Sequence, residues 1–192
     1  PPSDVIIPLE AMIDREPVTV ICSAKGWIRA AKGHLQDFEE VRYKDGDGKR
    51  FAFHAETTDK VLVFATNGRF YAMGADKLPG GRGFGEPLRL MFDMPSDHDI
   101  VSLFIFKPDR KLLLVSSDGR GFVVTEKDVF AQTRAGKQVL NVSGGNEAKI
   151  CTLAEGDSVA VVGDNRKLLV FDATELPEMT RGRGVMLQRY RD

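Results

Sequence analysis

Residues 60–72 read KVLVFATNGRFYA: an apolar run, a polar turn and a second apolar run. An Asn-Gly pair between two such runs is a strong signal for a β-hairpin with a tight turn. The same unit recurs three more times, as VTVICSAKGWIRA from Val18, KLLLVSSDGRGFVV from Lys111 and SVAVVGDNRKLLVF from Ser158. The chain is therefore built from a repeated hairpin.

The turns of the four hairpins are spaced like the repeats of a blade array. Gly26, Gly68 and Gly119 hold the same turn position, which Arg166 takes in the last copy, and the separations are 42, 51 and 47 residues. A single hairpin cannot bury its apolar face, so units with this period stack on their neighbours. The sequence predicts an all-β, propeller-like array of about four four-stranded blades, in a ring that is either closed or broken.

The predicted organisation is a lead-in segment over residues 1–17 and a single domain over residues 18–192. Its blade-like units lie near residues 18–59, 60–106, 111–155 and 158–190. The start at Pro1, without an initiator methionine, indicates a piece of a longer protein.

Local patterns predict further elements within these units. We expect strands at Ile100–Phe106 and Val139–Val142, with Val41 and Tyr43 as strand residues of one face. Helical segments are expected only as short pieces near Glu126–Phe130 and Ala173–Leu176.

Composition limits the function classes. The 192 residues are 42% hydrophobic and 29% charged, with a net charge of −1, so the chain as a whole is not a basic nucleic-acid binder. A local basic face remains open, because partners respond to the distribution of charge. No apolar run approaches the ~18 residues of a membrane span. We therefore expect a globular domain without a transmembrane segment.

The residue types of metal and catalytic sites are scattered. Cys22 and Cys151 lie far apart in apolar runs and are interpreted as buried, reduced thiols. Histidines are isolated from one another, and Asp97-His98-Asp99 is best interpreted as a solvated loop. No phosphate-binding Gly-rich motif, nucleophile elbow or metalloprotease motif occurs. We expect no catalytic residue, no metal site and no cofactor in this chain.

A loop rich in glycine and basic residues follows three of the four hairpins. Arg82, Arg134 and Arg181 follow the hairpin-turn residue by 14, 15 and 15 residues. Similar offsets would place these loops at equivalent points of successive blades, so that their cations form a row along one rim. The predicted DNA-binding residues are Arg82, Arg134, Lys137, Arg181, Arg183 and Arg189.

The chemistry of these loops suits phosphate. Glycine lets backbone N–H groups approach an anion, and the arginine fork matches phosphate oxygens. A curved row of such loops would contact a bent duplex through its backbone. The alternative is that the loops are tight turns with solvated arginines. The first unit departs from the pattern, with acidic residues at Asp37, Glu39 and Glu40, although Lys25, Arg29 and Lys32 could contribute cations from its hairpin.

These loops carry a resemblance to a known family. Gln132-Thr133-Arg134-Ala135-Gly136-Lys137-Gln138 is similar to the gyrase A signature QRRGGKG, retaining Gln132, Arg134, Gly136 and Lys137. LPGGRGFGEPL from Leu78 and MTRGRG from Met179 are more degenerate versions. From about Val18 onward the chain resembles the C-terminal domain of bacterial type IIA topoisomerase A subunits, on the topoisomerase IV side of that family.

The resemblance implies a β-pinwheel, in which neighbouring blades exchange a strand and DNA binds at the outer edge. It implies an arm that guides the transported duplex for decatenation and supercoil relaxation. Catalysis, ATP and magnesium would belong to other parts of the parent enzyme, an isomerase that also includes a topoisomerase IV B subunit. Double-stranded DNA and a condensin-type protein are the implied partners. The implied location is cytoplasmic and nucleoid-associated, with peripheral inner-membrane association of the parent left open.

Three alternatives stay open at this point. A gyrase A arm would wrap DNA chirally, although the incomplete signature argues against it. A propeller-type interaction module would bind a protein and ignore DNA. An enzyme would need a site at the centre of the array, for which the sequence offers no constellation of residues.

Overall fold

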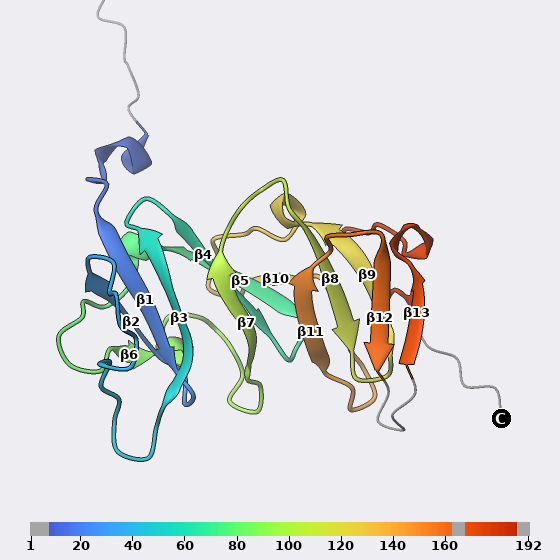
Figure 1. Ribbon diagram of the computed structural model, residues 1–192, viewed down its shortest axis with the longest axis horizontal. Helices are drawn as coiled ribbons and strands as arrows, with labels where there is room; N and C mark the ends of the chain where they lie inside the picture. Colours follow the sequence, from blue (N-terminus) through green and yellow to red (C-terminus); the bar gives the residue numbers. More distant parts are fainter. Residues whose placement is uncertain (1–7, 163–167, 188–192) are drawn as a thin grey trace, which may run out of the picture. The chain divides into compact units, whose positions relative to one another are not determined.

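The computed structural model describes residues 8–162 and 168–187 (Figure 1). The described residues form β-strands, loops and five short 3-10 helices: η1 (Leu9–Met12), η2 (Ala75–Lys77), η3 (Leu88–Leu90), η4 (Glu126–Asp128) and η5 (Ala173–Glu175). None of the helices in these ranges is long and apolar enough to cross a membrane. The predicted all-β class is confirmed.

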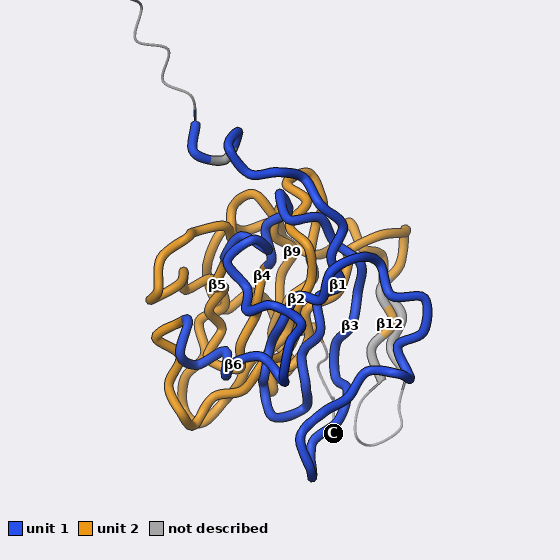
Figure 2. Tube along the Cα trace, turned by 90° about the vertical axis from the view of Figure 1, so that its left-hand side faces the viewer, with its two compact units in different colours: residues 1–61, 73–91 blue, residues 62–72, 92–192 orange. Residues whose placement is uncertain are grey.

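Figure 2 shows the two compact units into which the chain divides. Unit 1 comprises residues 1–61 and 73–91, and unit 2 comprises residues 62–72 and 92–192. The single-domain boundaries expected above stay a prediction.

Each of the first three hairpins forms the centre of a four-stranded antiparallel sheet. The first sheet has the order β3 (Lys49–Glu56), β1 (Pro17–Ser23), β2 (Trp27–Lys32) and β6 (Glu86–Pro87). The second has the order β10 (Lys137–Gln138), β5 (Arg69–Gly74), β4 (Lys60–Ala65) and β7 (Ile100–Ile105). The third has the order β11 (Ala148–Leu153), β8 (Lys111–Ser116), β9 (Arg120–Thr125) and β14 (Val185–Met186). The fourth hairpin, β12 (Ser158–Val162) and β13 (Leu168–Asp172), pairs as two strands within the described residues.

One edge strand of each four-stranded sheet comes from the connection that follows the next hairpin. Thus β6 follows the β4–β5 hairpin but pairs with β2, with Ile28 opposite Glu86. In the same way β10 pairs with β5, and β14 pairs with β9. This is the strand exchange of a β-pinwheel, as the resemblance implied. It closes the edge of each sheet, which would otherwise expose unpaired backbone groups.

The apolar runs of the hairpins supply the cores. In unit 1 the strands β1 and β2 bury Val20, Ile21, Cys22 and Ile28. In unit 2 the core cluster gathers residues from two hairpins and from the segment after β10: Leu62, Phe64, Phe70, Leu112, Leu114, Phe122, Val124, Val139 and Leu140. Lys111, the first residue of β8, is exposed, and the five strand residues after it are buried.

Several local expectations change in the structure. The strand expected at Val139–Val142 is wrong: β10 ends at Gln138, and the N–H groups of Val139 and Leu140 both bond to the carbonyl of Gly68, at 3.1 Å. Val41 and Tyr43 lie in a loop and not in a strand. The strand near Ile100 is confirmed as β7, and both expected helical pieces are single 3-10 turns, η4 and η5.

Candidate nucleic-acid interface

A glycine stands immediately before each exchanged strand, and the fold demands it. Gly85, Gly136 and Gly184 have φ of 82°, 67° and 75°. A β-carbon on them would lie 2.1 Å from the Ile28 oxygen, 2.5 Å from the Phe70 oxygen and 2.0 Å from the Gly121 oxygen, respectively. These distances are far below contact range, so only glycine lets the exchanged strand lie against its partner. Strand exchange, rather than phosphate, accounts for these glycines.

The far end of each exchanged strand is fixed by the neighbouring hairpin turn. The carbonyl of Gly26 accepts the N–H of Leu88 at 2.9 Å, that of Gly68 accepts Val139 at 3.1 Å, and that of Gly119 accepts Leu187 at 2.9 Å. Leu88, Val139 and Leu187 are all buried. Each Gly/Arg loop therefore leads into a strand that is fixed at both ends.

Unit 2 presents two of these loops, and backbone hydrogen bonds join them. The N–H of Gly182 donates to the Val139 carbonyl at 2.9 Å, and the N–H of Asn141 donates to the Gly182 carbonyl at 2.7 Å. These bonds connect the Arg181–Arg183 loop with the segment that directly follows Arg134 and Lys137. The structure thus brings these predicted cations into adjoining loops.

The predicted cations of unit 2 differ in their exposure and in the groups that their side chains contact. Arg181 is exposed, and the part of the chain that the structure describes gives its side chain no ion pair. Arg134 is exposed, with its Nε 3.3 Å from Asp93 Oδ1. Arg183 Nη2 lies 3.6 Å from Asp118 Oδ2. Lys137 is half-buried, and its ammonium donates to the Asp128 carbonyl at 2.6 Å, so it is the least accessible of the four. Gln132, from the degenerate signature, is exposed.

In unit 1, Arg82 lies exposed in the loop before β6. That loop is shaped by Arg29, whose Nη1 donates to the carbonyls of Gly83 at 2.6 Å and Gly81 at 3.3 Å, while its Nη2 donates to the Arg42 carbonyl at 2.6 Å. Arg29 is only 8% exposed. The expectation that Arg29 could offer a cation to DNA is therefore wrong, because backbone carbonyls occupy its donors.

The loops are less regular than their offsets from the hairpin turns implied. Counted from the glycine before the exchanged strand, Arg82 and Arg181 both lie three residues upstream, but Arg134 lies two upstream and Arg183 one. Arg134 therefore does not occupy the place that Arg82 and Arg181 share. Arg166 and the predicted site residue Arg189 lie outside the described residues.

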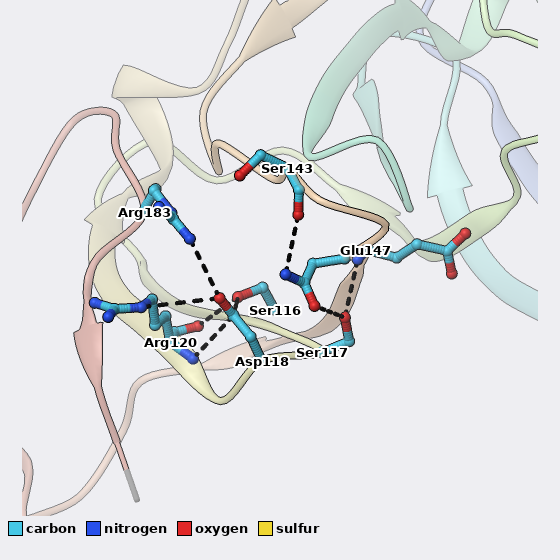
Figure 3. Close-up of polar contacts among 8 residues, drawn as sticks. Ser116, Ser117, Asp118, Arg120, Ser143, Glu147 and Arg183 are labelled. Atoms are coloured by element: carbon cyan, nitrogen blue, oxygen red, sulfur yellow. Dashed lines mark hydrogen bonds and ion pairs between the residues drawn. The ribbon is translucent and has the colours of Figure 1, made fainter. Parts of the chain in front are cut away.

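Two residues of this surface, Asp118 and Arg120, are not part of the site predicted from the sequence. Asp118 Oδ2 lies 3.6 Å from Arg183 and 3.8 Å from Arg120 Nε, so one carboxylate oxygen faces two arginines (Figure 3). In the sequence, Asp118 belongs to the polar turn of the hairpin that begins at Lys111, and no further role is predicted for it. The matched charges of Asp118 and Arg183 at corresponding points of the repeat could have pointed to Asp118, whereas no such pattern marks Arg120.

Other site chemistry is sparse. Within the described residues no group of three or more His, Cys, Asp or Glu could hold a metal ion. A cavity of about 450 Å³ in unit 1 is lined by Arg29, Leu35, Glu40 and Phe84 among others. Its buried cation, Arg29, is committed to backbone carbonyls.

Comparisons with known proteins agree with this geometry. The solved C-terminal domain of E. coli ParC matches 91% of this chain and 72% of that chain, with a TM-score of 0.80 and 31% identity. The chain belongs to the family of C-terminal domains of topoisomerase IV A subunits. The DNA topoisomerase 4 A subunit of Caulobacter vibrioides is 51% identical over 193 residues, which cover 100% of this chain, and that of Rickettsia bellii is 45% identical over 187 residues, which cover 97%.

Two further comparisons describe this family's fold. The family model described as DNA gyrase C-terminal domain, beta-propeller, matches residues 110–161 and 157–192. The solved C-terminal domain of another DNA topoisomerase IV has a TM-score of 0.77 over 94% of this chain and 59% of that chain at 19% identity, which shows the fold alone. The chain spans 25% of the length of the curated topoisomerase relatives.

Proposed function

We propose that this topoisomerase IV-type domain binds duplex DNA through its phosphates. The observation that carries the proposal is the pair of adjoining loops in unit 2, which expose Arg134, Arg181 and Arg183 on a backbone held by strand exchange. Arginine forks suit phosphate oxygens, and a loop backbone that is already fixed by hydrogen bonds needs little further ordering on binding. The contacts proposed are all to phosphates, which carry no sequence information, so binding would be independent of sequence.

In the parent enzyme the domain would act as an arm that guides the transported duplex for decatenation and supercoil relaxation. The catalytic residues, the ATP and magnesium sites and the contacts with the B subunit would lie in the rest of the parent chain. A condensin-type protein is a proposed second partner, and the proposed location is cytoplasmic and nucleoid-associated. The similarity to topoisomerase IV A subunits along the whole chain supports this assignment over a gyrase-type wrapping arm.

The test is a titration of the chain with a linear duplex of about 40 base pairs at several salt concentrations. Arg134→Ala combined with Arg181→Ala should weaken binding severalfold and reduce the salt slope, because each lost phosphate contact removes about 0.9 from it. Lys107→Ala combined with Lys127→Ala removes the same charge from exposed positions at the opposite end of the β8–β9 hairpin from its turn. If both pairs weaken binding equally, the loops are not the interface. If the unaltered chain ignores duplex at low salt, a protein-interaction module becomes the better account.

A further inference from the structure

Asp118 lies between two arginines at the tip of the β8–β9 hairpin. Its Oδ2 atom is 3.6 Å from Arg183 Nη2, on the loop before β14, and 3.8 Å from Arg120 Nε, at the start of β9 (Figure 3). The side chain of Arg183 is 53% exposed and that of Asp118 is 22% exposed. The two guanidinium groups therefore converge on a single oxygen at the surface, as they would on a phosphate.

The repeat itself supplies a comparison. Asp118 precedes the turn glycine of its hairpin, and Arg183 precedes the glycine of the strand that this hairpin receives. At the corresponding two positions the preceding hairpin has Asn67 and Ala135. The carboxylate is thus present where an arginine faces the turn, and absent where alanine does.

The turn does not need the charge. Asn67 Oδ1 accepts the N–H of Arg69 at 3.0 Å, just as Asp118 Oδ1 accepts the N–H of Arg120 at 3.4 Å. An amide oxygen therefore serves the hairpin as well as a carboxylate, and Asn-Gly is the preferred pair for such turns.

Backbone contacts also fasten this turn without help from Asp118. The N–H of Ser117 donates to the Glu147 carbonyl at 2.7 Å. The Ser117 hydroxyl accepts the Glu147 N–H at 3.0 Å (Figure 3). Ion pairs that are partly exposed and this far apart add little to stability. The charge of Asp118 is thus surplus to the fold, and its effect falls on what else the arginines can bind.

We propose that Arg120 and Arg183 form a phosphate site whose internal occupant is the Asp118 carboxylate. A DNA phosphate must displace or share with this carboxylate, so Asp118 restrains the affinity of this hairpin for duplex. The hydrogen bond from Ser116 Oγ, with the nearby Arg183, holds the pKa of Asp118 below its ordinary value and so favours the charged form of the competitor. This inference rests on the proposed DNA binding and assigns Asp118 and Arg120 a part in it.

The experiment measures duplex affinity and its salt dependence for Asp118→Asn. Affinity should rise severalfold, and the log–log salt slope should steepen by about 0.9 for each additional phosphate that the two arginines engage. Asp109→Asn is the matched control: it removes the same charge from an exposed turn of unit 2, and the described residues give its side chain no ion pair. The control should change affinity slightly through the general field and leave the slope unaltered.

A double-mutant cycle separates this site from a general charge effect. In the Arg183→Ala background, Asp118→Asn should raise affinity much less than in the parent chain, because half of the site is gone. Equal increases in both backgrounds, or an increase no larger than that of Asp109→Asn, would overturn the inference while leaving the proposed function intact. If the unaltered chain binds no duplex, the proposed function fails. The inference then depends on Asp118→Asn alone: binding that appears in this variant supports it, and a continued lack of binding overturns it.

Discussion

The carbonyl oxygen of Phe70 lies 2.5 Å from the point where a β-carbon on Gly136 would stand. Phe70 belongs to one hairpin, and Gly136 to the connection after the next hairpin, so this approach joins two repeats. The same relationship holds for Ile28 with Gly85 and for Gly121 with Gly184. It is the steric condition on which strand exchange depends.

Gly136→Ala should destabilise the chain by about 3 kcal/mol or more, because it adds a clash with backbone to the strain of a positive φ. Gly144→Ala is the matched control, with φ of 63° and nothing within 4 Å of the added carbon, and it should cost only about 1–2 kcal/mol. Urea unfolding of both variants measures the difference. Equal losses would show that the approach to Phe70 relaxes freely.

Arg29→Lys should lower stability by about 1.5–3 kcal/mol, because one ammonium cannot replace the guanidinium that bonds the carbonyls of Gly81, Gly83 and Arg42. Arg82→Lys, in the loop that Arg29 supports, should leave the midpoint of thermal unfolding nearly unchanged, since Arg82 is exposed. An Arg29→Lys variant as stable as the parent chain would contradict the role of Arg29 in positioning the loop before β6.

Arg110→Met should destabilise unit 2 by about 3–5 kcal/mol, because it leaves a buried carboxylate without its cation. Glu126 is 0% exposed and receives Arg110 Nε at 2.9 Å and Nη2 at 3.0 Å, together with the N–H of Lys107 at 2.9 Å. Lys111→Met breaks the neighbouring but exposed pair with Glu178 and should cost less than about 1 kcal/mol. Chemical denaturation compares the two variants, and a similar cost for both would refute the distinction.

Stability should fall at alkaline pH in a way that depends on Cys151. Burial, with the charge of Glu126 second, raises the pKa of this thiol from 9.0 to about 12. The unfolded chain therefore releases the thiol proton first, so the contribution of Cys151 is complete below about pH 9 and is lost toward pH 12. The loss is at most about 1.4 kcal/mol per pH unit.

The measurement is the free energy of unfolding at pH 8 and pH 10 for the parent chain and for Cys151→Ala. All other titratable groups, Cys22 included, are common to the two chains, so the change with pH in the difference between their unfolding free energies isolates the Cys151 thiol. A difference that stays constant across this range would mean that the Cys151 thiol is accessible to solvent in the folded state.

Much of the architecture was readable from the hairpins. Asn67-Gly68 and Asp118-Gly119 sit between apolar runs whose residues must share a core, and the structure places hairpins there. The Gly/Arg loops were also found, but their glycines were interpreted as phosphate cradles. Gly136 is instead required by Phe70, more than sixty residues earlier in the chain, and no local pattern reveals that contact.

Which of the cations are accessible to a partner could likewise not be predicted from the sequence. The sequence shows only that Arg29, Lys137 and Arg134 carry positive charge. In the structure Arg29 and Lys137 donate to backbone carbonyls, and Arg134 faces Asp93. Burial and hydrogen bonding decide whether an arginine is a structural brace or an exposed charge, and both depend on residues far away in the chain.

The sequence by itself determined the repeated hairpin, the all-β class and the chemical character of the loops, because turn chemistry and apolar periodicity are local properties. Only the tertiary structure decided which strand closes each sheet, which glycines the fold requires and which arginines remain exposed. Those outcomes arise from contacts between residues far apart in the chain. Among them, the backbone of one hairpin lies too close to the connection after the next hairpin for any residue except glycine.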